Sequence, residues 1–410
     1  MNTTGSITHA PYADELHWPE GLVPLRNEDD GTLAEPYEQY AWLRENAPVV
    51  RLRTGGEDVW IVTRYDDVRA AARMHKVFSS QMSDVEQPTF ITLFDGADHT
   101  RLRRVYAEAF NPKSVALVAD RVRERAEHLI DELIDDGRGD VVDRVCVPLT
   151  MATIGGILDV PTTDVSKLKF WSNELLVWHS RFRGLPSTDE SAGHTQDFFA
   201  YLQERLEQLH ADKSESVGGH LARNWKEGNI TAKEAREMGA FLFMAGHDTT
   251  TFLIGNGFRE LVDNPSLLDR IRRNPADAER FVEELARKRG PVHRIHRRTM
   301  EDVDLGGVTI PKRGLVRLVI ASANRDSAKF ADPDKFDLDR DYTGHLGFGF
   351  GVHSCIGVPL ARLEARILVE VLAQKVGTLK IGPGPSLVLT PGHAITLGPT
   401  ELDVELTAAR

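Results

Sequence analysis

The chain has 410 residues and a formal net charge of −12, and hydrophobic residues make up 41% of it. This composition is ordinary for a globular protein, but the acidic balance argues against a nucleic-acid partner, because phosphate binding needs a basic face. Only two cysteines occur, Cys146 and Cys355, which excludes a disulfide framework and a thiolate zinc site. The first thirty residues contain no apolar run of signal-peptide or membrane-anchor length. We therefore expect a cytoplasmic protein with no membrane contact.

The N-terminal part of the sequence predicts an arm, a helix and a small sheet. Residues 1–35 are polar and rich in Pro, Gly and Asp, so we expect an irregular arm. A short helix is predicted over 37–46. The apolar alternation and Gly-Gly turn within 49–62 are typical of a β-hairpin. A helix over 66–74 and a loop over 79–95 follow.

The middle of the chain is predominantly helical by its apolar spacing. Thr231 and Glu234 form a capping box, and no residue except glycine interrupts the helical pattern from there to Asn264. A helix of about 33 residues would be roughly 50 Å long. The shorter helices are predicted at 100–109, 112–136 and 141–160, and as a pair within 163–211 that is broken near Gly184 and Pro186.

The C-terminal part predicts one more helix pair and a minor β region. Helices are expected from Pro275 to Arg289 and from Val358 to about Val376, separated by a loop-rich segment over 324–351. Neither an internal repeat nor a linker is visible. Residues 36–410 are therefore predicted to form a single domain, mainly α with a minor β region. The expected strands are 308–310, 315–320, 379–381, 387–389 and 402–406.

A single thiol lies in a glycine-rich loop just before the last long helix. The sequence from Gly347 to Gly357 reads GFGFGVHSCIG, with Cys355 near its end. Glycines allow the backbone to pass close to a flat, bulky group, and the amino end of a helix favours a thiolate over a thiol. The pattern therefore predicts a nucleophile or a metal ligand at Cys355. The alternative is a buried structural cysteine.

The pattern Phe-Gly-x-Gly-x-His-x-Cys-x-Gly resembles the cysteine-ligand loop of the cytochrome P-450 family, the haem-thiolate monooxygenases. The resemblance implies the single-domain cytochrome P-450 fold, with haem b between the long central helix and the helix after the cysteine loop. Cys355 would be the axial iron ligand. Phe348, Gly349, His353 and Gly357 would contact the cofactor.

The long helix carries the sequence Ala245-Gly246-His247-Asp248-Thr249-Thr250 near its middle. Asp248 and Thr249 are costly inside a helix with apolar neighbours, since both compete for backbone hydrogen bonds. Gly246 removes side-chain bulk where a flat ligand could approach. The segment resembles the family's oxygen-activation motif, in which an acid and an alcohol deliver protons, and Ala245 and Gly246 would contact the haem. The alternative is a polar solvated face.

Two further motifs have positions that match the family. Glu284 and Arg287 form a Glu-x-x-Arg pair, and Arg340 would complete a structural network with them; a surface ion pair is the alternative. Cations are needed for the haem propionates, and the resemblance implies that they come from His99, Arg103, Arg297 and His353. Arg298 remains an alternative to Arg297.

The resemblance also implies which segments line a substrate pocket. In this chain the segment after Pro291 contains His293, Arg294 and His296, where relatives usually have apolar residues. We therefore expect an anionic or hydrogen-bonding substrate, unless these side chains point to propionates or solvent. The pocket candidates are Phe90, Phe94, Phe182, Phe241, Met244, Val292, His293, Arg294, Ile295, His296 and Ile395.

The resemblance covers essentially the whole chain and implies a monooxygenase that inserts one atom of dioxygen into a small organic substrate by hydroxylation, epoxidation or O-dealkylation. Electrons would come from NAD(P)H through a ferredoxin reductase and a ferredoxin. Oxidative coupling or peroxygenase chemistry is the alternative outcome for an enzyme. A haem gas sensor or electron carrier is the non-enzymatic alternative, and it leaves Asp248 and Thr249 without a purpose.

Overall fold

The computed structural model describes residues 9–25, 35–54, 56–82, 87–110, 112–180, 188–384, 387–389 and 395–409. They group into two compact units, each assembled from segments far apart in the sequence. The first unit takes Met1–Met82, Glu283–Cys355 and Leu389–Leu397, and the second takes Ser83–Val282, Ile356–Val388 and Gly398–Arg410. One of the points at which the chain passes from one unit to the other, between Val282 and Glu283, falls inside α11 (Asp277–Arg289).

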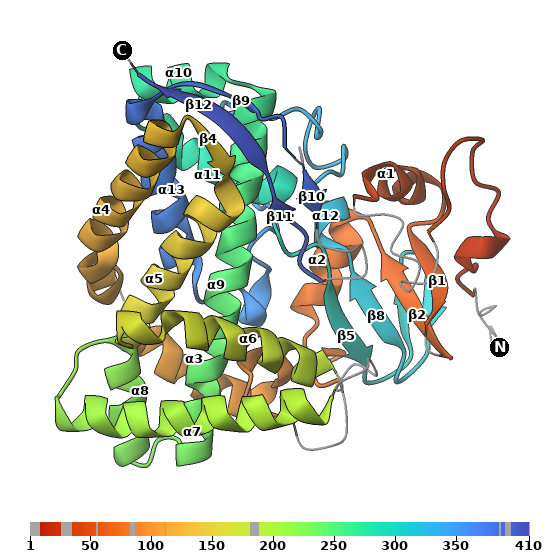
Figure 1. The fold of residues 1–410 in the computed structure, drawn as a ribbon. Helices are drawn as coiled ribbons and strands as arrows, with labels where there is room; N and C mark the ends of the chain where they lie inside the picture. Colours follow the sequence, from red (N-terminus) through yellow and green to blue (C-terminus); the bar gives the residue numbers. More distant parts are fainter. Residues whose placement is uncertain are drawn as a thin grey trace, which may run out of the picture. The chain divides into compact units, whose positions relative to one another are not determined.

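A five-stranded sheet organises the first unit (Figure 1). Its strand order is β1-β2-β8-β5-β3, in which β2 and β8 run parallel and the other neighbours antiparallel. A separate hairpin joins β6 and β7. The bounds are β1 (Val49–Thr54), β2 (Glu57–Val62), β3 (Phe78–Ser79), β5 (Ile295–Thr299), β6 (Val303–Leu305), β7 (Val308–Ile310) and β8 (Leu315–Leu318), with helices η1 (Ala13–Glu15), α1 (Tyr37–Asn46), α2 (Tyr65–Arg73), α12 (Ile320–Ala323) and η7 (Gly351–His353).

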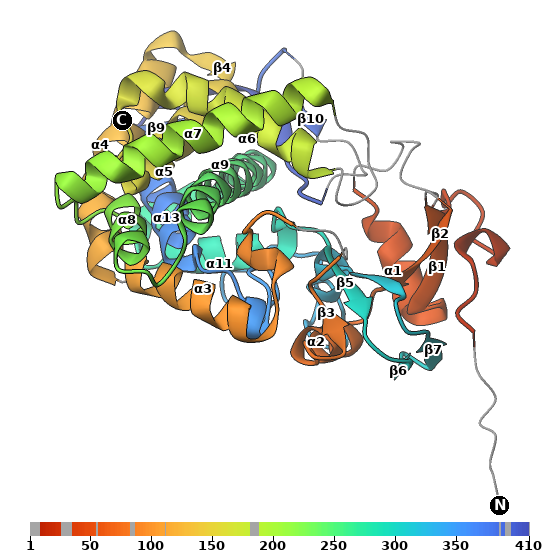
Figure 2. The ribbon, with the colours of Figure 1, turned by 90° about the horizontal axis from the view of Figure 1, so that it is seen from below.

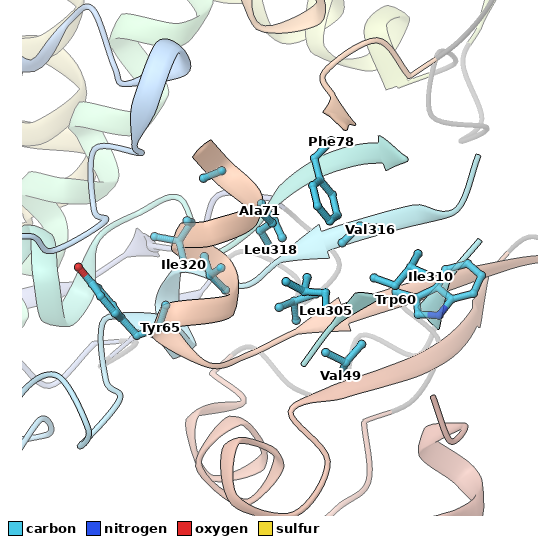
Figure 3. Close-up of a cluster of buried hydrophobic side chains, with 14 of the residues drawn as sticks. Val49, Trp60, Tyr65, Ala71, Phe78, Leu305, Ile310, Val316, Leu318 and Ile320 are labelled. Carbon is cyan, nitrogen blue, oxygen red and sulfur yellow. The ribbon is translucent and has the colours of Figure 1, made fainter. Parts of the chain in front are cut away.

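The sheet has an apolar cluster on each face because successive strand residues point to opposite sides. Val316 and Leu318 of β8 pack with Phe78 and with α2 in the cluster shown in Figure 3. The opposite face packs Val59 and Ile61 against α1. A residue of β5 or β8 can therefore be assigned to a face from its strand register.

The second unit is built around α9 (Ala232–Asp263), which packs against α5, α7, α8 and α13. Figure 2 looks nearly along α9 and shows these helices around it. Its amino end has the predicted capping box: Glu234 N–H donates to Thr231 Oγ1 at 3.1 Å, and Thr231 N–H donates to Glu234 Oε2 at 2.7 Å. The other helices are η3 (Ile91–Leu93), α3 (Gly96–Ala109), α4 (Pro112–Asp136), η4 (Val142–Cys146), α5 (Val147–Leu158), η5 (Thr162–Asp164), α6 (Val165–Ser180), α7 (Asp189–Ala211), α8 (Val217–Lys226), α10 (Ser266–Arg273) and α13 (Val358–Lys375).

Short strands complete the second unit. A three-stranded antiparallel sheet has the order β4-β12-β9, and a two-stranded sheet pairs β10 with β11. Their bounds are β4 (Arg138–Asp140), β9 (Val376–Ile381), β10 (Val388–Leu389), β11 (Pro399–Glu401) and β12 (Asp403–Ala408). None of the helices among the described residues is long and apolar enough to cross a membrane.

The predicted mainly helical fold with a minor β part is confirmed, with local differences. The helix expected over 141–160 begins instead with a π-helical turn, η4, and only then becomes α5. The strand expected over 315–320 ends at Leu318, because Ile320 already starts α12. Strand β5 was not predicted: its sequence IHRRT lacks an apolar alternation, and the strand forms because β8 offers an edge to pair with.

Candidate active site

The cysteine loop of the first unit is a series of tight turns that ends on Cys355. Gly349 N–H donates to Leu346 O at 2.8 Å, and Cys355 N–H donates to Phe348 O at 2.8 Å. Gly349 and Gly351 both have φ of +74°, a conformation that side chains with a Cβ rarely adopt. Cys355 is exposed at the end of this loop, three residues before α13 begins.

Two of the predicted propionate ligands, His353 and Arg297, belong to the first unit. His353 Nε2 lies 3.0 Å from Ser80 Oγ, directly after β3. Arg297 of β5 is opposite Val316, so it shares the face of the Figure 3 cluster, against which Phe350 of the cysteine loop also packs. Arg298 instead donates to Glu57 Oε1 at 2.8 Å. These contacts favour Arg297 over Arg298 as the cation near the loop.

The Glu-x-x-Arg pair is a buried network, not a surface ion pair. Glu284 and Arg287 side chains are both 0% exposed, and Arg287 donates through Nε and Nη2 to the two carboxylate oxygens at 2.7 and 2.8 Å. Arg340 Nε donates to Glu284 Oε1 at 3.0 Å. Asp337 N–H donates to the same oxygen. The three predicted members therefore meet, with charge-assisted bidentate geometry.

The acid–alcohol pair lies in the middle of α9, in the second unit. Thr249 Oγ1 donates to Ala245 O one turn earlier at 2.7 Å, which leaves the hydroxyl oxygen able to accept. Asp248 is 26% exposed, and its Oδ1 lies 2.8 Å from His247 Nδ1. That approach lacks the alignment of a hydrogen bond, and His247 itself is buried. The carboxyl group thus combines access to solvent with a basic neighbour.

On one side of α9, the missing side chain of Gly246 leaves room for a residue of α5. A Cβ at this position would meet Ile154 Cδ1 of α5 at 2.8 Å, which is closer than real Cβ contacts. The missing side chain therefore allows α5 to pack tightly against α9. It does not open the helix surface in that direction, and a contact of Gly246 or Ala245 with a cofactor stays a prediction.

The apolar pocket candidates of the second unit converge on one turn of α9. Phe90 is fully buried and stacks on Phe241 with ring centroids 5.0 Å apart. Met244, also buried, lies one turn further along α9. Phe94 is half-buried after η3. The predicted propionate ligands of this unit are the buried His99 and Arg103, which lie one turn apart on α3. Phe182 lies outside the described residues.

The pocket candidates of the first unit form a paired segment. Val292 bridges Thr396 antiparallel, and His293 N–H donates to Ile395 O at 3.0 Å, so the segments that contain Val292 and Ile395 do lie side by side. His293 Nε2 lies 3.3 Å from Tyr37 Oη on α1. Ile295 and the buried Arg294 follow Val292 and His293 in this segment, where β5 begins.

His296 and Arg317 are opposite each other in the β5–β8 register, and Arg317 Nε donates to His296 Nε2 at 3.0 Å. Arg317 is also in register with Ile61, so both side chains lie on the α1 face of the sheet, opposite Arg297. His293 and His296 thus each have a protein partner, and their contact with a substrate stays a prediction.

Comparisons with known proteins agree on one family. The Cytochrome P-450 family model matches residues 190–376. The chain is 34% identical to the cytochrome P-450 monooxygenase PikC of Streptomyces venezuelae over 377 residues, which cover 88% of this chain and 89% of that protein. It is 31% identical to the 6-deoxyerythronolide B hydroxylase of Saccharopolyspora erythraea, covering 87% and 92%. A solved cytochrome P-450 structure from Chondromyces apiculatus superposes with a TM-score of 0.82 at 34% identity, covering 92% of this chain and 96% of that one.

The chain belongs to the cytochrome P-450 family. It is a haem-thiolate monooxygenase with the P-450 fold, which confirms the family, the fold class and the enzyme class predicted from the cysteine loop.

The residues of this P-450 fit a haem with a thiolate ligand. Of the two thiols, Cys146 is fully buried between η4 and α5, and burial raises the pKa of its thiol. Cys355 is exposed on a loop whose glycines leave the backbone bare of side chains. A thiolate ligand must be deprotonated and accessible, so the donor chemistry fits Cys355 and excludes Cys146.

Three contacts of this P-450 escaped prediction because they join residues far apart in the sequence. His345 Nε2 lies 3.0 Å from Glu283 Oε2, and both side chains are buried. Thr89 donates to Glu237 of α9. Arg317 meets His296. No local sequence pattern links the two members of each pair, so none of the three contacts carried a signal in the sequence.

Proposed function

We propose that Cys355 is the axial thiolate of the haem iron and that this P-450 inserts one atom of dioxygen into a small organic substrate. The observation that carries the proposal is the contrast between the two thiols. Only Cys355 is exposed, and it ends a tight glycine loop before a helix amino terminus, where the thiolate is favoured. Residues 36–410 would act as one haem-thiolate domain.

Four cations would hold the haem propionates. Two of them belong to the first unit: Arg297 of β5 is buried, and His353 of the cysteine loop contacts Ser80. His99 and Arg103 are one turn apart on α3. Arg offers a bidentate fork to a carboxylate and His a single N–H. Phe348, Gly349 and Gly357 would contact the haem from the cysteine loop.

Haem with a thiolate ligand supplies the reductive activation of dioxygen. The chain supplies the protons. Thr249 Oγ1 donates to Ala245 O, so its lone pairs are free to accept a hydrogen bond from a reacting group and hold it in place. Asp248, partly exposed, would take a proton from solvent at a carboxylate oxygen and pass it inward.

The substrate would pack on an apolar surface formed by Phe90, which precedes η3, and by Phe241 and Met244 of α9. Their stacking supports an apolar surface on α9, and Phe94 lies on the same loop as Phe90. Val292, Ile295 and Ile395 stay the apolar pocket candidates of the first unit. Arg294, with His293 and His296, stays the candidate for an anionic or hydrogen-bonding part of the substrate. Relatives named vitamin D(3) 25-hydroxylase, erythromycin C-12 hydroxylase and mycinamicin IV hydroxylase/epoxidase support an organic substrate that is hydroxylated or epoxidised.

Electrons would come from NAD(P)H through a ferredoxin reductase and a ferredoxin, in the cytoplasm. A basic face near the thiolate would steer an acidic partner. The candidate cations for this face are Arg101, Arg104, Lys113, Arg362 and Arg366. Two of them form ion pairs: Arg101 pairs with Glu234 at 2.6 Å, and Arg366 pairs with Glu370 at 2.8 Å. Arg104 and Arg362 are exposed, which supports such a face.

The test is a screen for small molecules that shift the haem spectrum, followed by product analysis with a surrogate ferredoxin and its reductase. The proposal predicts an oxygenated product from at least one tight binder. NAD(P)H consumption without an oxygenated product from any tight binder would count against it. Replacing Arg294 by Ala tests the anionic class separately: a selective loss of affinity for carboxylate ligands is expected, and equal affinities would refute that part.

A further inference from the structure

Two adjacent carboxylates of α11 anchor two different parts of the segment that leads to Cys355. Glu284 holds Arg287 and Arg340 in the buried network described above. Glu283, 6% exposed at its side chain, holds His345 with 3.0 Å between Oε2 and Nε2. Glu-x-x-Arg accounts for the first anchor only. The contact between Glu283 and His345 is not part of that motif.

His345 connects its anchor directly to the cysteine loop. Gly347 N–H donates to His345 Nδ1 at 3.2 Å, so Nδ1 has the lone pair and the proton is on Nε2, towards Glu283. The edge of the Phe348 ring meets the imidazole, with centroids 5.9 Å apart. Gly347 and Phe348 belong to the same turn, and the Phe348 carbonyl oxygen accepts the hydrogen bond from Cys355 N–H. Glu283 therefore fixes the ring, and the ring fixes the turn.

Asn324 makes a second connection between α11 and the same turn. Its backbone O accepts from Arg287 Nη1 at 2.7 Å, and its side-chain Oδ1 accepts from Leu346 N–H at 2.6 Å. Asn324 is 1% exposed, so neither bond competes with water. Leu346 O then accepts from Gly349 N–H. An unbroken series of hydrogen bonds runs from Glu284 to the loop.

The loop also touches the α11 backbone. A Cβ at Gly347 would lie 2.2 Å from Ala286 O, so only glycine permits this approach. Ala286 lies between Glu284 and Arg287 on the helix that carries both anchors. The cysteine loop is thus held at three consecutive residues, Leu346 by Asn324, Gly347 by His345 and α11, and Phe348 by His345.

We propose that His345 and Asn324 are positioning residues for the axial ligand: they hold the Leu346–Phe348 turn to α11 and thereby keep Cys355 in place as the thiolate ligand of iron. The inference rests on the proposed role of Cys355. A loop released from either contact reaches conformations in which the sulfur is protonated or displaced from iron. The loss of one buried hydrogen bond changes the ratio of thiolate-ligated to other protein about tenfold.

The experiment compares the carbon monoxide complex of the reduced holoprotein in the wild type and in His345→Leu, Asn324→Leu and the milder Glu283→Gln and Asn324→Ser. Haem content is measured in parallel. Each variant is expected to lose part of the red-shifted thiolate band at unchanged haem content, more in the two Leu variants than in the mild ones. His345→Asn, which can still accept from Gly347 N–H, should retain more of the band than His345→Leu.

Two controls separate positioning from stability. Glu279→Gln changes an exposed carboxylate on α11, and Ile61→Ala lowers stability from the opposite face of the sheet. Both should keep the full thiolate band, although Ile61→Ala lowers the unfolding temperature. A full red-shifted band in both Glu283→Gln and Asn324→Ser overturns the proposal, also where a Leu variant fails to hold haem. A wild type without the band refutes the role of Cys355 instead.

Discussion

The carboxylate of Glu237 accepts two hydrogen bonds from Thr89, one from the backbone N–H at 2.8 Å and one from the side-chain hydroxyl at 2.7 Å. Both bonds are buried, and they fix the loop to α9 one turn before Phe241. Phe90, the next residue, stacks on Phe241. One acidic residue of α9 thus sets the position of the loop that carries the aromatic pocket candidates.

Glu237→Ala should loosen this loop. Two buried bonds to a charged acceptor are lost, each worth about 1.5–3 kcal/mol. We expect faster hydrogen exchange at the amides of residues 87–94 and at least tenfold weaker binding of ligands that pack on Phe90. Thr89→Val removes only the hydroxyl bond and should show a smaller effect. Unchanged exchange in Glu237→Ala would contradict the assignment.

Thr249→Ala should uncouple NAD(P)H oxidation from product formation. The hydroxyl that holds a reacting group in place is lost, so reducing equivalents appear as peroxide and product per NAD(P)H falls. Thr249→Ser keeps a hydroxyl able to donate to Ala245 O and should restore coupling. Peroxide and product are quantified in the same reaction; tight coupling in the Ala variant would show that Thr249 does not have this role.

Arg287→Ala should destabilise the protein strongly, because the buried Glu284 carboxylate loses its bidentate partner and keeps only the bonds from Arg340 Nε and Asp337 N–H. Removal of one member of a buried ion pair costs about 3–5 kcal/mol. Urea unfolding of the holoprotein measures the loss. Lys335→Gln is the matched control: it breaks an exposed pair with Asp337 and should cost less than about 1 kcal/mol. Similar losses in the two variants would argue against a buried network.

Glu364 on α13 predicts a pH dependence of stability. Burial raises the pKa of its carboxyl well above the usual value, and a hydrogen bond from Thr153 offsets only part of this effect. The folded protein then binds a proton that the unfolded chain releases once the pH exceeds about 4.3. Below that pH the carboxyl group is protonated in both states, so its ionisation does not change the free energy of unfolding. Above that pH it lowers the free energy of unfolding increasingly.

Glu364→Gln should therefore gain stability over the wild type between pH 5 and 8, by at most about 1.4 kcal/mol per pH unit. The difference in unfolding free energy is measured at several pH values, with the exposed Glu279→Gln as control. A difference that stays constant over this range would show that the carboxyl group does not titrate as expected.

The long helix could be predicted from the sequence because its signals are local. Thr231 and Glu234 cap its start, and both hydrogen bonds of the box are present. The Glu284–Arg287–Arg340 network was predicted because the chain resembles the family's Glu-x-x-Arg motif, whereas the spacing of Glu284 and Arg287 alone also fits a surface ion pair. Strand β5 could not be predicted, since Arg297 and Arg298 are tolerated there only because β8 and β3 pair with that segment.

The role of a residue could not be predicted from the sequence where it depends on a partner far away along the chain. Gly246 is required because Ile154 of α5 occupies the space that a Cβ would fill, and this packing cannot be predicted from the local sequence. Glu283 and His345 are 62 positions apart, and no local pattern links them. The side chain of His296 has its partner, Arg317, on the neighbouring strand. The spacing of the sequence motifs indicated the candidate site residues. The side chains that hold those residues in position became visible only in the packed structure.

The central claim is that Cys355, and not Cys146, is the thiolate ligand of the haem iron. The most direct measurement is the absorption spectrum of the reduced carbon monoxide complex for the wild type, Cys355→Ser and Cys146→Ser. We predict the red-shifted thiolate band in the wild type and in Cys146→Ser, and its complete loss in Cys355→Ser. A red-shifted band that persists in Cys355→Ser, or that disappears in Cys146→Ser, would contradict the account.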